Sequence, residues 1–173
     1  MIFTGIKRKS NQLFFNKQLP DFLKNSRRSS SKKVKKVIVF LDDISEKSAI
    51  EIGIISLLKL SLDDIEMLVF NPKASKENKI EGVFTSKDFG WYGKINSESL
   101  KSILTNKYDL LINYSKVESL YSNLLILQCK ATFRVGFAHF DNRFYDLLIE
   151  CENADIELFN SELIKYLKIL NKI

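Results

Sequence analysis

The stretch Val37-Ile-Val-Phe-Leu41 (VIVFL) is a continuous apolar run that starts directly after Lys36 and stops at Asp42. A strand that is buried on both faces has this pattern, because helices cover both sides of a parallel sheet and neither face meets water. The run is also too short for a helix of ordinary length. It therefore predicts the first strand of a parallel sheet.

From this strand to the C-terminus, segments of helical and strand periodicity alternate. Helical spacing of apolar residues predicts helices at 45–60, 97–104, 118–129 and 156–170. Short apolar runs predict further strands at 65–70, 80–84, 109–114, 133–137 and 146–150. This alternation predicts an α/β fold, a three-layer Rossmann-like sandwich with a mainly parallel sheet.

The part upstream of the first strand differs in charge. Residues 1–36 carry eleven Lys and Arg against a single acid, Asp21, and the remaining residues are net negative. Apolar residues recur there at intervals near three and four, which predicts an amphipathic helix or a helix pair that Pro20 breaks or starts. Residues 25–36 read as a flexible basic linker. We therefore expect a basic helical extension with its linker at 1–36 and a domain at 37–173 that folds without it.

Composition excludes several classes of protein. No apolar run approaches the roughly 20 residues of a membrane-spanning helix, and no apolar core of a signal peptide follows the N-terminal charges. Cys129 and Cys151 are too few for a disulfide framework, so we expect reduced thiols in the cytoplasm. A lone His makes a zinc site hard to assemble, and no glycine-rich phosphate loop is present. We expect neither a metal nor a cofactor.

Ligands of open α/β sheets bind outside the carboxyl ends of the strands. That rule predicts one surface made by the loops that follow the strands, with these members: Asp42, Asp43, Asp88, Trp91, Tyr92, Asn113, Ser115 and His139. An Asp pair before a helix is usually a turn or cap, and otherwise a general base or metal ligand. A lone His usually satisfies a local hydrogen bond, and otherwise acts in catalysis.

Within that surface the stretch SKDFGWYGKI at 86–95 is unusual, because it places the single Trp of the chain in a loop. Gly90 and Gly93 permit close turns. The aromatic residues Phe89, Trp91 and Tyr92 either cover the apolar core or form a surface that stacks on a ligand or partner.

Two resemblances extend this reading. The segments FTSKDFGW at 84–91, KYDLLINY at 107–114, FRVGF at 133–137 and ELIKYLKILNKI at 162–173 resemble an uncharacterised bacterial family that has no assigned activity. Residues 108–137 are also similar to part of the acceptor-side domain of heptosyltransferase-like glycosyltransferases, and this similarity implies a Rossmann-like fold and a small transferase-like enzyme.

The sequence thus leaves two functions open. The first is a non-catalytic binding or adaptor protein whose α/β domain docks a protein partner. Its basic extension would contact RNA, a ribosome or an anionic membrane face. The residues predicted to bind the polyanion are Lys7, Arg8, Lys9, Arg27, Arg28, Lys32, Lys33, Lys35 and Lys36. In a further alternative, the apolar side of the extension simply packs on the domain.

The second function is a small transferase or hydrolase. It would use Asp42 or Asp43 together with Asn113, Ser115 and His139, all of which the strand-end rule brings to one edge.

Overall fold

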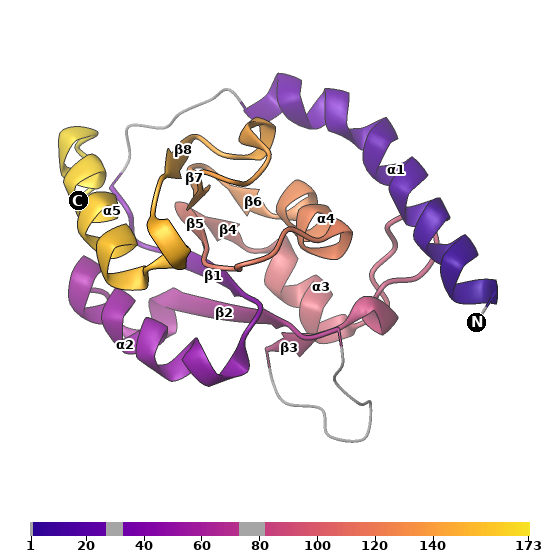
Figure 1. Cartoon of the computed structure of the whole chain (residues 1–173), viewed down its shortest axis with the longest axis horizontal. Helices are drawn as coiled ribbons and strands as arrows, with labels where there is room; N and C mark the ends of the chain where they lie inside the picture. The colour runs from indigo at the N-terminus through magenta and orange to yellow at the C-terminus, as the bar shows by residue number, and fades with distance from the viewer. Residues whose placement is uncertain (1, 27–32, 73–81) are drawn as a thin grey trace.

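A computed structural model describes residues 2–26, 33–72 and 82–173, and it forms a three-layer α/β sandwich (Figure 1). The main sheet has six strands in the order β3-β2-β1-β5-β7-β8, and every neighbouring pair is parallel. These strands are β1 (Val37–Leu41), β2 (Ile65–Phe70), β3 (Val83–Phe84), β5 (Leu110–Asn113), β7 (Arg134–Phe137) and β8 (Leu147–Ile149). The predicted fold class is confirmed.

Five α-helices surround the sheet in the described part of the chain. They are α1 (Ile2–Ser26), α2 (Lys47–Leu58), α3 (Glu98–Thr105), α4 (Leu120–Gln128) and α5 (Ile156–Ile169). Ser97 and Ser119 cap α3 and α4 by accepting a backbone N–H at the helix start, as N-cap serines ordinarily do. A second sheet, made of β4 (Lys107–Tyr108) and β6 (Lys130–Ala131), has no counterpart in the sequence prediction.

The strand order places β1 at the centre of the sheet. The chain runs outward from β1 through β2 to β3, returns through α3, and then runs outward on the other side through β5, β7 and β8. The direction of winding therefore reverses between β1 and β5, the position at which doubly wound sheets ordinarily hold their ligands.

The two faces of β1 belong to two separate cores. Val37, Val39 and Leu41 pack in the core beneath α2 and α5. Ile38 and Phe40 pack in the core beneath α1, α3 and α4. All five residues of the strand are buried, which explains why the sequence shows no alternation there.

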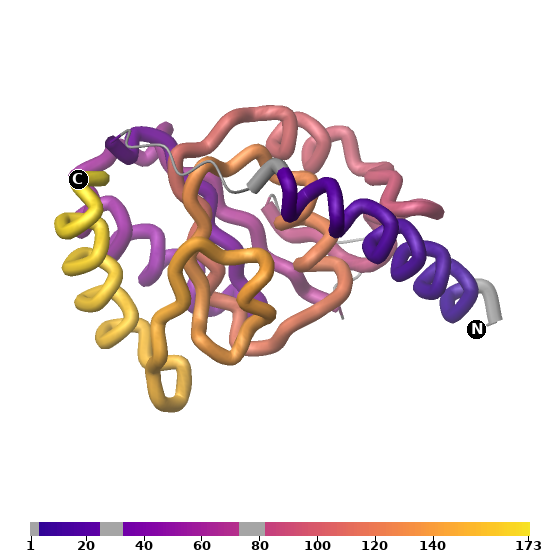
Figure 2. The backbone as a smooth tube through the Cα atoms, turned by 90° about the horizontal axis from the view of Figure 1, so that it is seen from above, coloured from indigo at the N-terminus to yellow at the C-terminus, as the bar shows by residue number. Residues whose placement is uncertain are grey.

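Helix α1 packs as part of the helical layer beside α4 (Figures 1 and 2). Phe15 and Leu19 are buried in the core beneath it. The rings of Phe15 and Phe22 each lie 5.6 Å from the ring of Phe144. The apolar side of α1 therefore packs on the domain, which was one of the alternatives for this segment.

The expected break at Pro20 is wrong, because Pro20 lies inside α1, which is a single helix. Proline removes one backbone hydrogen bond and costs about 3 kcal/mol in a helix interior. Pro20 is exposed, so water can solvate the carbonyl group that loses its N–H partner. Burial of Phe15 and Leu19 offsets that cost. Of the predicted linker, residues 27–32 lie outside the described residues.

Substitution of Phe15 tests whether α1 is part of the cooperative fold. Phe15→Ala should lower the free energy of unfolding by about 3 kcal/mol, because it leaves a cavity beside Phe144. Leu13→Ala is the matched control, since Leu13 is 66% exposed on the same helix. Urea denaturation followed by far-UV circular dichroism gives both values. If Phe15→Ala unfolds at the wild-type midpoint, residues 1–36 are the removable extension that the sequence suggests.

Candidate functional site

The switch point between β1 and β5 is bridged by a single carboxylate. Asp42 follows β1, and its Oδ2 accepts the backbone N–H groups of Lys116 at 2.7 Å and of Val117 at 3.0 Å. Lys116 Nζ also donates to Glu46 Oε1 at 2.5 Å. The loop after β1 and the loop after β5 are therefore bound to each other across the position where the strand order reverses.

The neighbouring Asp43 is a local cap. Its Oδ1 accepts the hydroxyl of Ser45 at 2.7 Å and the backbone N–H of Ser45 at 2.9 Å. The Ser45 hydroxyl and then its N–H hold the pKa of this carboxyl below its ordinary value. This geometry matches the turn-and-cap interpretation of the Asp pair.

The end of β5 is occupied by a small buried polar cluster. Asn113 Nδ2 donates to the Tyr145 hydroxyl at 2.7 Å, and Asn113 Oδ1 accepts the N–H of Ser115 at 3.0 Å. Burial raises the pKa of Tyr145 far above its ordinary value, so this phenol stays protonated. Among the described residues, the buried Ser115 Oγ has no hydrogen-bond partner. No described base therefore activates the Ser115 hydroxyl.

The predicted histidine lies apart from this cluster. His139 is exposed, and its ring stacks on Phe137 with centroids 5.7 Å apart and also lies against Phe140. Asp88 likewise serves its own loop, where Oδ2 accepts the N–H of Thr85 at 2.7 Å. Asp42 thus follows β1, Ser115 follows β5 and His139 follows β7. No described hydrogen bond joins Ser115 or His139 to a carboxylate.

The loop at 86–95 is held by polar side chains of α1. Lys7 Nζ donates to the carbonyl oxygens of Ser86 at 3.1 Å and of Phe89 at 2.9 Å. Asn11 is fully buried, where its Nδ2 donates to Gly90 O at 3.1 Å and its Oδ1 accepts the N–H of Gly93 at 2.8 Å. The helix therefore fixes the loop backbone from both sides of the turn.

Gly93 is required for this close contact. Its φ is +70°, and a Cβ there would lie 2.2 Å from the ring of Phe14. Only glycine satisfies both the left-handed backbone and the approach of that ring.

The three aromatic residues of the loop separate into two roles. Phe89 is fully buried and packs against Phe84 and Tyr121, so it belongs to the core. Trp91 and Tyr92 are 44% and 66% exposed. Tyr92 also has a φ of +53°, which is uncommon for a bulky residue. Phe89 thus covers the core, as the first alternative predicts, and the stacking role of Trp91 and Tyr92 stays a prediction.

The backbone of Tyr92 is bonded to α1 at a position that exposed aliphatic residues flank. The N–H of Tyr92 donates to Ser10 Oγ at 3.0 Å, and residues three and four positions from Ser10 are its neighbours along the helix. Those neighbours include Ile6 and Leu13, which are also exposed. We call the group of Ile6, Leu13, Trp91 and Tyr92 the apolar tip. Sequence reasoning missed its formation, although the polar Ser10 and Asn11 within the apolar stripe of α1 were a signal for it.

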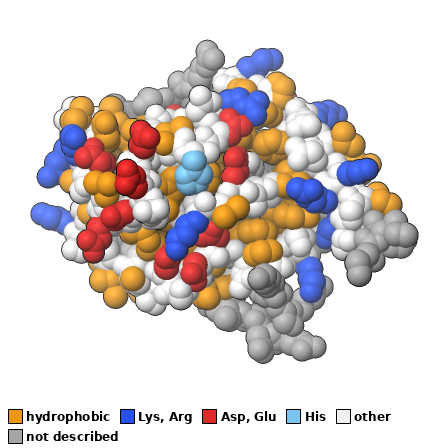
Figure 3. All heavy atoms as spheres, in the orientation of Figure 1, with side chains coloured by type: hydrophobic (Ala, Val, Ile, Leu, Met, Phe, Trp, Pro, Cys, Tyr) orange, Lys and Arg blue, Asp and Glu red, His pale blue; other side chains and the backbone are white. Residues whose placement is uncertain are grey.

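Cationic side chains follow the same exposed side of α1. Lys9, Lys17 and Lys24 are exposed, and helical spacing places them on the side that carries Leu13. In Figure 3 the Lys and Arg side chains predominate on the right, where α1 lies in Figure 1, and Asp and Glu gather to the left. Asp21 is the single acid of this helix.

The described members of the predicted polyanion-binding set are divided between α1 and the segment before β1. Arg8 and Lys9 are exposed on α1, but Lys7 donates to the loop at 86–95. Lys33, Lys35 and Lys36 are exposed just before β1, where the backbone N–H groups of Lys35 and Lys36 donate to Asp109. Arg27, Arg28 and Lys32 lie outside the described residues.

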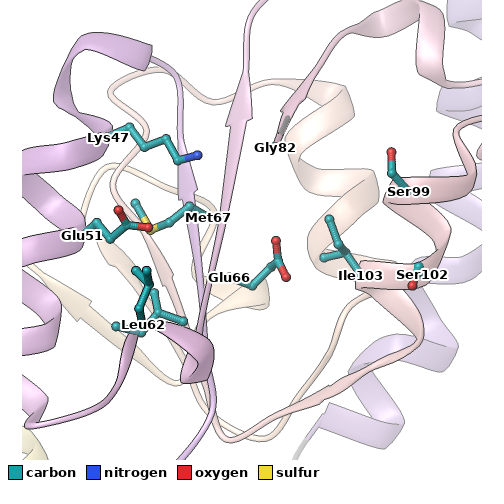
Figure 4. A pocket seen from close by; sticks show the side chains of 10 residues that line it. Lys47, Glu51, Leu62, Glu66, Met67, Gly82, Ser99, Ser102 and Ile103 are labelled. Carbon is teal, nitrogen blue, oxygen red and sulfur yellow. The ribbon is translucent and has the colours of Figure 1, made fainter. Parts of the chain in front are cut away.

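Two pockets lie away from the switch point. One, of about 560 Å³, opens at the free edge of β2 between α2 and α3 (Figure 4). Here β3 pairs only with Val69 and Phe70, so the first half of β2 has β1 on one edge and no described strand on the other. In Figure 4, Glu66 points toward the side of Ser99 and Ser102, while Lys47 and Glu51 come from α2. The second pocket, of about 650 Å³, lies between the ends of α2 and α5.

Within the described ranges, no group of three or more His, Cys, Asp or Glu side chains could hold a metal ion. Over the same residues, no helix has both the length and the apolar character needed to cross a bilayer. Burial raises the pKa of Cys129 to about 12, so its thiol is protonated at neutral pH.

Residues 7–170 match the model of a family of unknown function, DUF6913, and the chain belongs to this family. The matched region includes almost all of α1 as well as the sheet. No curated protein and no solved structure matches the chain.

The bridge at the switch point can be tested by removing its carboxylate. Asp42→Ala should lower the free energy of unfolding by about 1–2 kcal/mol, because the N–H groups of Lys116 and Val117 lose a charged acceptor. Asp42→Asn keeps an amide oxygen that can accept one of these bonds, so it should cost less. Urea denaturation measures both variants. Equal stability of Asp42→Ala and the wild type would mean that this carboxylate does not hold the two loops together.

Proposed function

We propose that this chain is a non-catalytic binding protein that docks on an anionic membrane face through α1 and the apolar tip. The observation that carries the proposal is the exposure of Trp91 and Tyr92 in a loop that is bonded to α1 between exposed aliphatic residues of that helix. Exposed apolar groups of this size, gathered and rimmed by polar residues, ordinarily mark a protein or membrane contact.

The chemistry of this surface is complementary to a lipid interface. Trp and Tyr favour the level of the lipid headgroups, where an apolar ring can be buried while its polar atom stays in water. Lys9, Lys17 and Lys24 can place their alkyl stems along the surface and their ammonium groups near lipid phosphates. Each Lys near an anionic leaflet contributes about 1 kcal/mol, and the cytoplasmic leaflet is the anionic one.

The aliphatic members of the tip favour a membrane over RNA. RNA binders use aromatic faces on which bases stack, and Ile6 and Leu13 offer no such face. Insertion into lipid, in contrast, uses aliphatic and aromatic groups alike. The inserting residues differ from those that the apolar periodicity of α1 first suggests. Phe14 lies against Gly93, and the guanidinium of Arg134 lies 4.9 Å from the ring centroid of Phe22.

The non-catalytic part of the proposal is supported by the carboxyl edge of the sheet. Asp42 and Asp43 are engaged by backbone N–H groups, and Ser115 has no described base beside it. The alternative function, a small transferase or hydrolase, would need Asp42, Asp43 or Ser115 to be aligned with a base or a nucleophile.

Trp91 is the single Trp of the chain, so tryptophan fluorescence, excited selectively over that of the tyrosines, reports on the apolar tip. Vesicles containing about one-third phosphatidylserine should shift its emission to the blue, because the indole moves from water into the headgroup region. Leu13→Ala should weaken partitioning about tenfold, since burial of a Leu side chain contributes about 1.5 kcal/mol or more. Ile52→Ala is the matched control, because Ile52 is 66% exposed on α2.

Two further ligands separate the alternatives. Vesicles of phosphatidylcholine alone should give a much weaker shift, because they lack the anionic charge. A single-stranded oligouridylate should leave the emission unchanged. Quenching by the RNA, combined with no shift on anionic vesicles, would refute membrane docking and assign the surface to nucleic acid.

The cations of α1 give an independent test. Replacing Lys9, Lys17 and Lys24 together by Gln should reduce partitioning to anionic vesicles by about two orders of magnitude and flatten its salt dependence. Replacing Lys33, Lys35 and Lys36 by Gln removes the same charge from the segment before β1, and it should have a small effect. Vesicle sedimentation over a series of salt concentrations measures both variants. Equal losses from the two variants would show that net charge, not the surface of α1, controls binding.

A further inference from the structure

We propose that the pocket between the ends of α2 and α5 binds a free fatty acid, with its aliphatic chain inside and its carboxylate at the mouth. The pocket has a volume of about 650 Å³, within the roughly 300–1,000 Å³ that is usual for small-molecule sites. Six apolar residues and three lysines line it: Val34, Leu57, Leu58, Leu60, Ile164 and Ile173, with Lys33, Lys59 and Lys168.

The walls of the pocket suit an aliphatic chain. Leu57, Leu60, Ile164 and Ile173 are half-buried, and all four pack against the core beneath α2 and α5. Their remaining exposed surface faces a concave space, so a ligand chain there would complete the burial that the fold leaves partial. No aromatic side chain lines the pocket in the described part of the chain, which disfavours a nucleotide base or another flat ring as its occupant.

The mouth of the pocket selects an anion. Lys33 comes from the segment before β1, Lys59 from the end of α2, and Lys168 from the last turn of α5. Three separate elements thus contribute exposed lysines to the lining of one apolar cavity, and no Asp or Glu is among its described lining residues. Even with the α-carboxylate of Ile173 counted, this lining is net positive. A carboxylate complements the charge of the three lysines, and an alkyl chain attached to it complements the apolar residues that line the rest of the pocket.

The backbone of Lys59 is a second, independent observation. Lys59 follows the last residue of α2 with φ 54° and ψ 42°, the left-handed conformation in which helices usually carry glycine. A residue with a Cβ holds this conformation at a cost in free energy. A lysine at this position is explained if its ammonium group is used at the mouth of the pocket.

This site does not depend on the proposed membrane surface. The C-terminal end of α5 and the N-terminal end of α1 lie at opposite ends of the molecule (Figures 1 and 2). Either site can therefore be present without the other, and variants at one serve as controls for the other.

Isothermal titration calorimetry of the full chain with decanoate, below its micellar concentration, tests the proposal. Decanoate should bind with one site per chain. Decanol has the same chain without the charge and should bind at least about tenfold more weakly, because it lacks the charge-assisted hydrogen bonds. Decyltrimethylammonium should not bind at this site. Equal affinities for decanoate and decanol, or no heat with decanoate, would overturn the proposal.

Lys59→Gly separates a role in binding from a role in the fold. It should weaken decanoate binding about tenfold while leaving the thermal unfolding midpoint unchanged or higher, because glycine adopts the left-handed conformation without strain. Its affinity for decanol should match that of the wild type. A Lys59→Gly chain that binds decanoate as the wild type does would refute the assignment of Lys59 to the carboxylate.

Ile164→Trp blocks the cavity from a half-buried position and should abolish binding. Lys17→Gln, on α1, is the control and should leave decanoate affinity unchanged. Light scattering during the titration distinguishes a remaining alternative: decanoate-independent dimers that disappear with Ile164→Trp would mean that a second copy of the chain, not a fatty acid, covers the pocket.

Discussion

Complete burial of β1 is the constraint on which the rest of this structure depends. Each of its five residues is enclosed by a helical layer above or below, and its backbone pairs with β2 on one edge and β5 on the other. No water reaches these peptide groups, so the neighbouring strands must supply their hydrogen bonds. Both helical layers must also be present. The layer that contains α1 covers Ile38 and Phe40, and the layer of α2 and α5 covers the three remaining side chains. The strand order and the switch point are both arranged around this central strand.

The attachment of α1 illustrates how polar side chains can fix an irregular loop. The backbone of residues 86–95 folds against the helix, where its carbonyl and N–H groups would lose water. Lys7, Ser10 and Asn11 supply the missing partners, and Asn11 is fully buried while it does so. An unpaired amide at that depth would cost about 1–3 kcal/mol, so these three residues are matched to the loop and not simply tolerated. The same contacts hold Trp91 and Tyr92 outward, which links the packing of the helix to the exposed surface that we propose to be functional.

The sequence predicts much of the fold because most elements carry their own signal. The strand at 65–70 coincides with β2, and the helix predicted from Ile156 begins there as α5. Signals fail where tertiary contacts decide the outcome. Pro20 reads locally as a break, yet burial of Phe15 and Leu19 keeps α1 continuous. The apolar tip and the pocket between the ends of α2 and α5 each combine residues far apart in the chain. No local pattern reveals that Ser10 bonds to Tyr92 or that Lys33 and Lys168 line the same pocket. The charge excess of residues 1–36 is visible in the sequence, but its division between two ends of the molecule is not.

The switch point of this sheet holds an anion that the chain itself supplies. In doubly wound sheets, the backbone N–H groups of the strand-end loops are what a bound anion ordinarily uses. Here the N–H groups of Lys116 and Val117 are already taken by Asp42, so the chain provides its own anion at that position. The ammonium of Lys116 is likewise neutralised by Glu46. An incoming phosphate or carboxylate would have to displace a tethered carboxylate that has no translational entropy to regain. The carboxylate of Asp42 thus binds the two halves of the sheet together at the position where doubly wound sheets ordinarily hold their ligands.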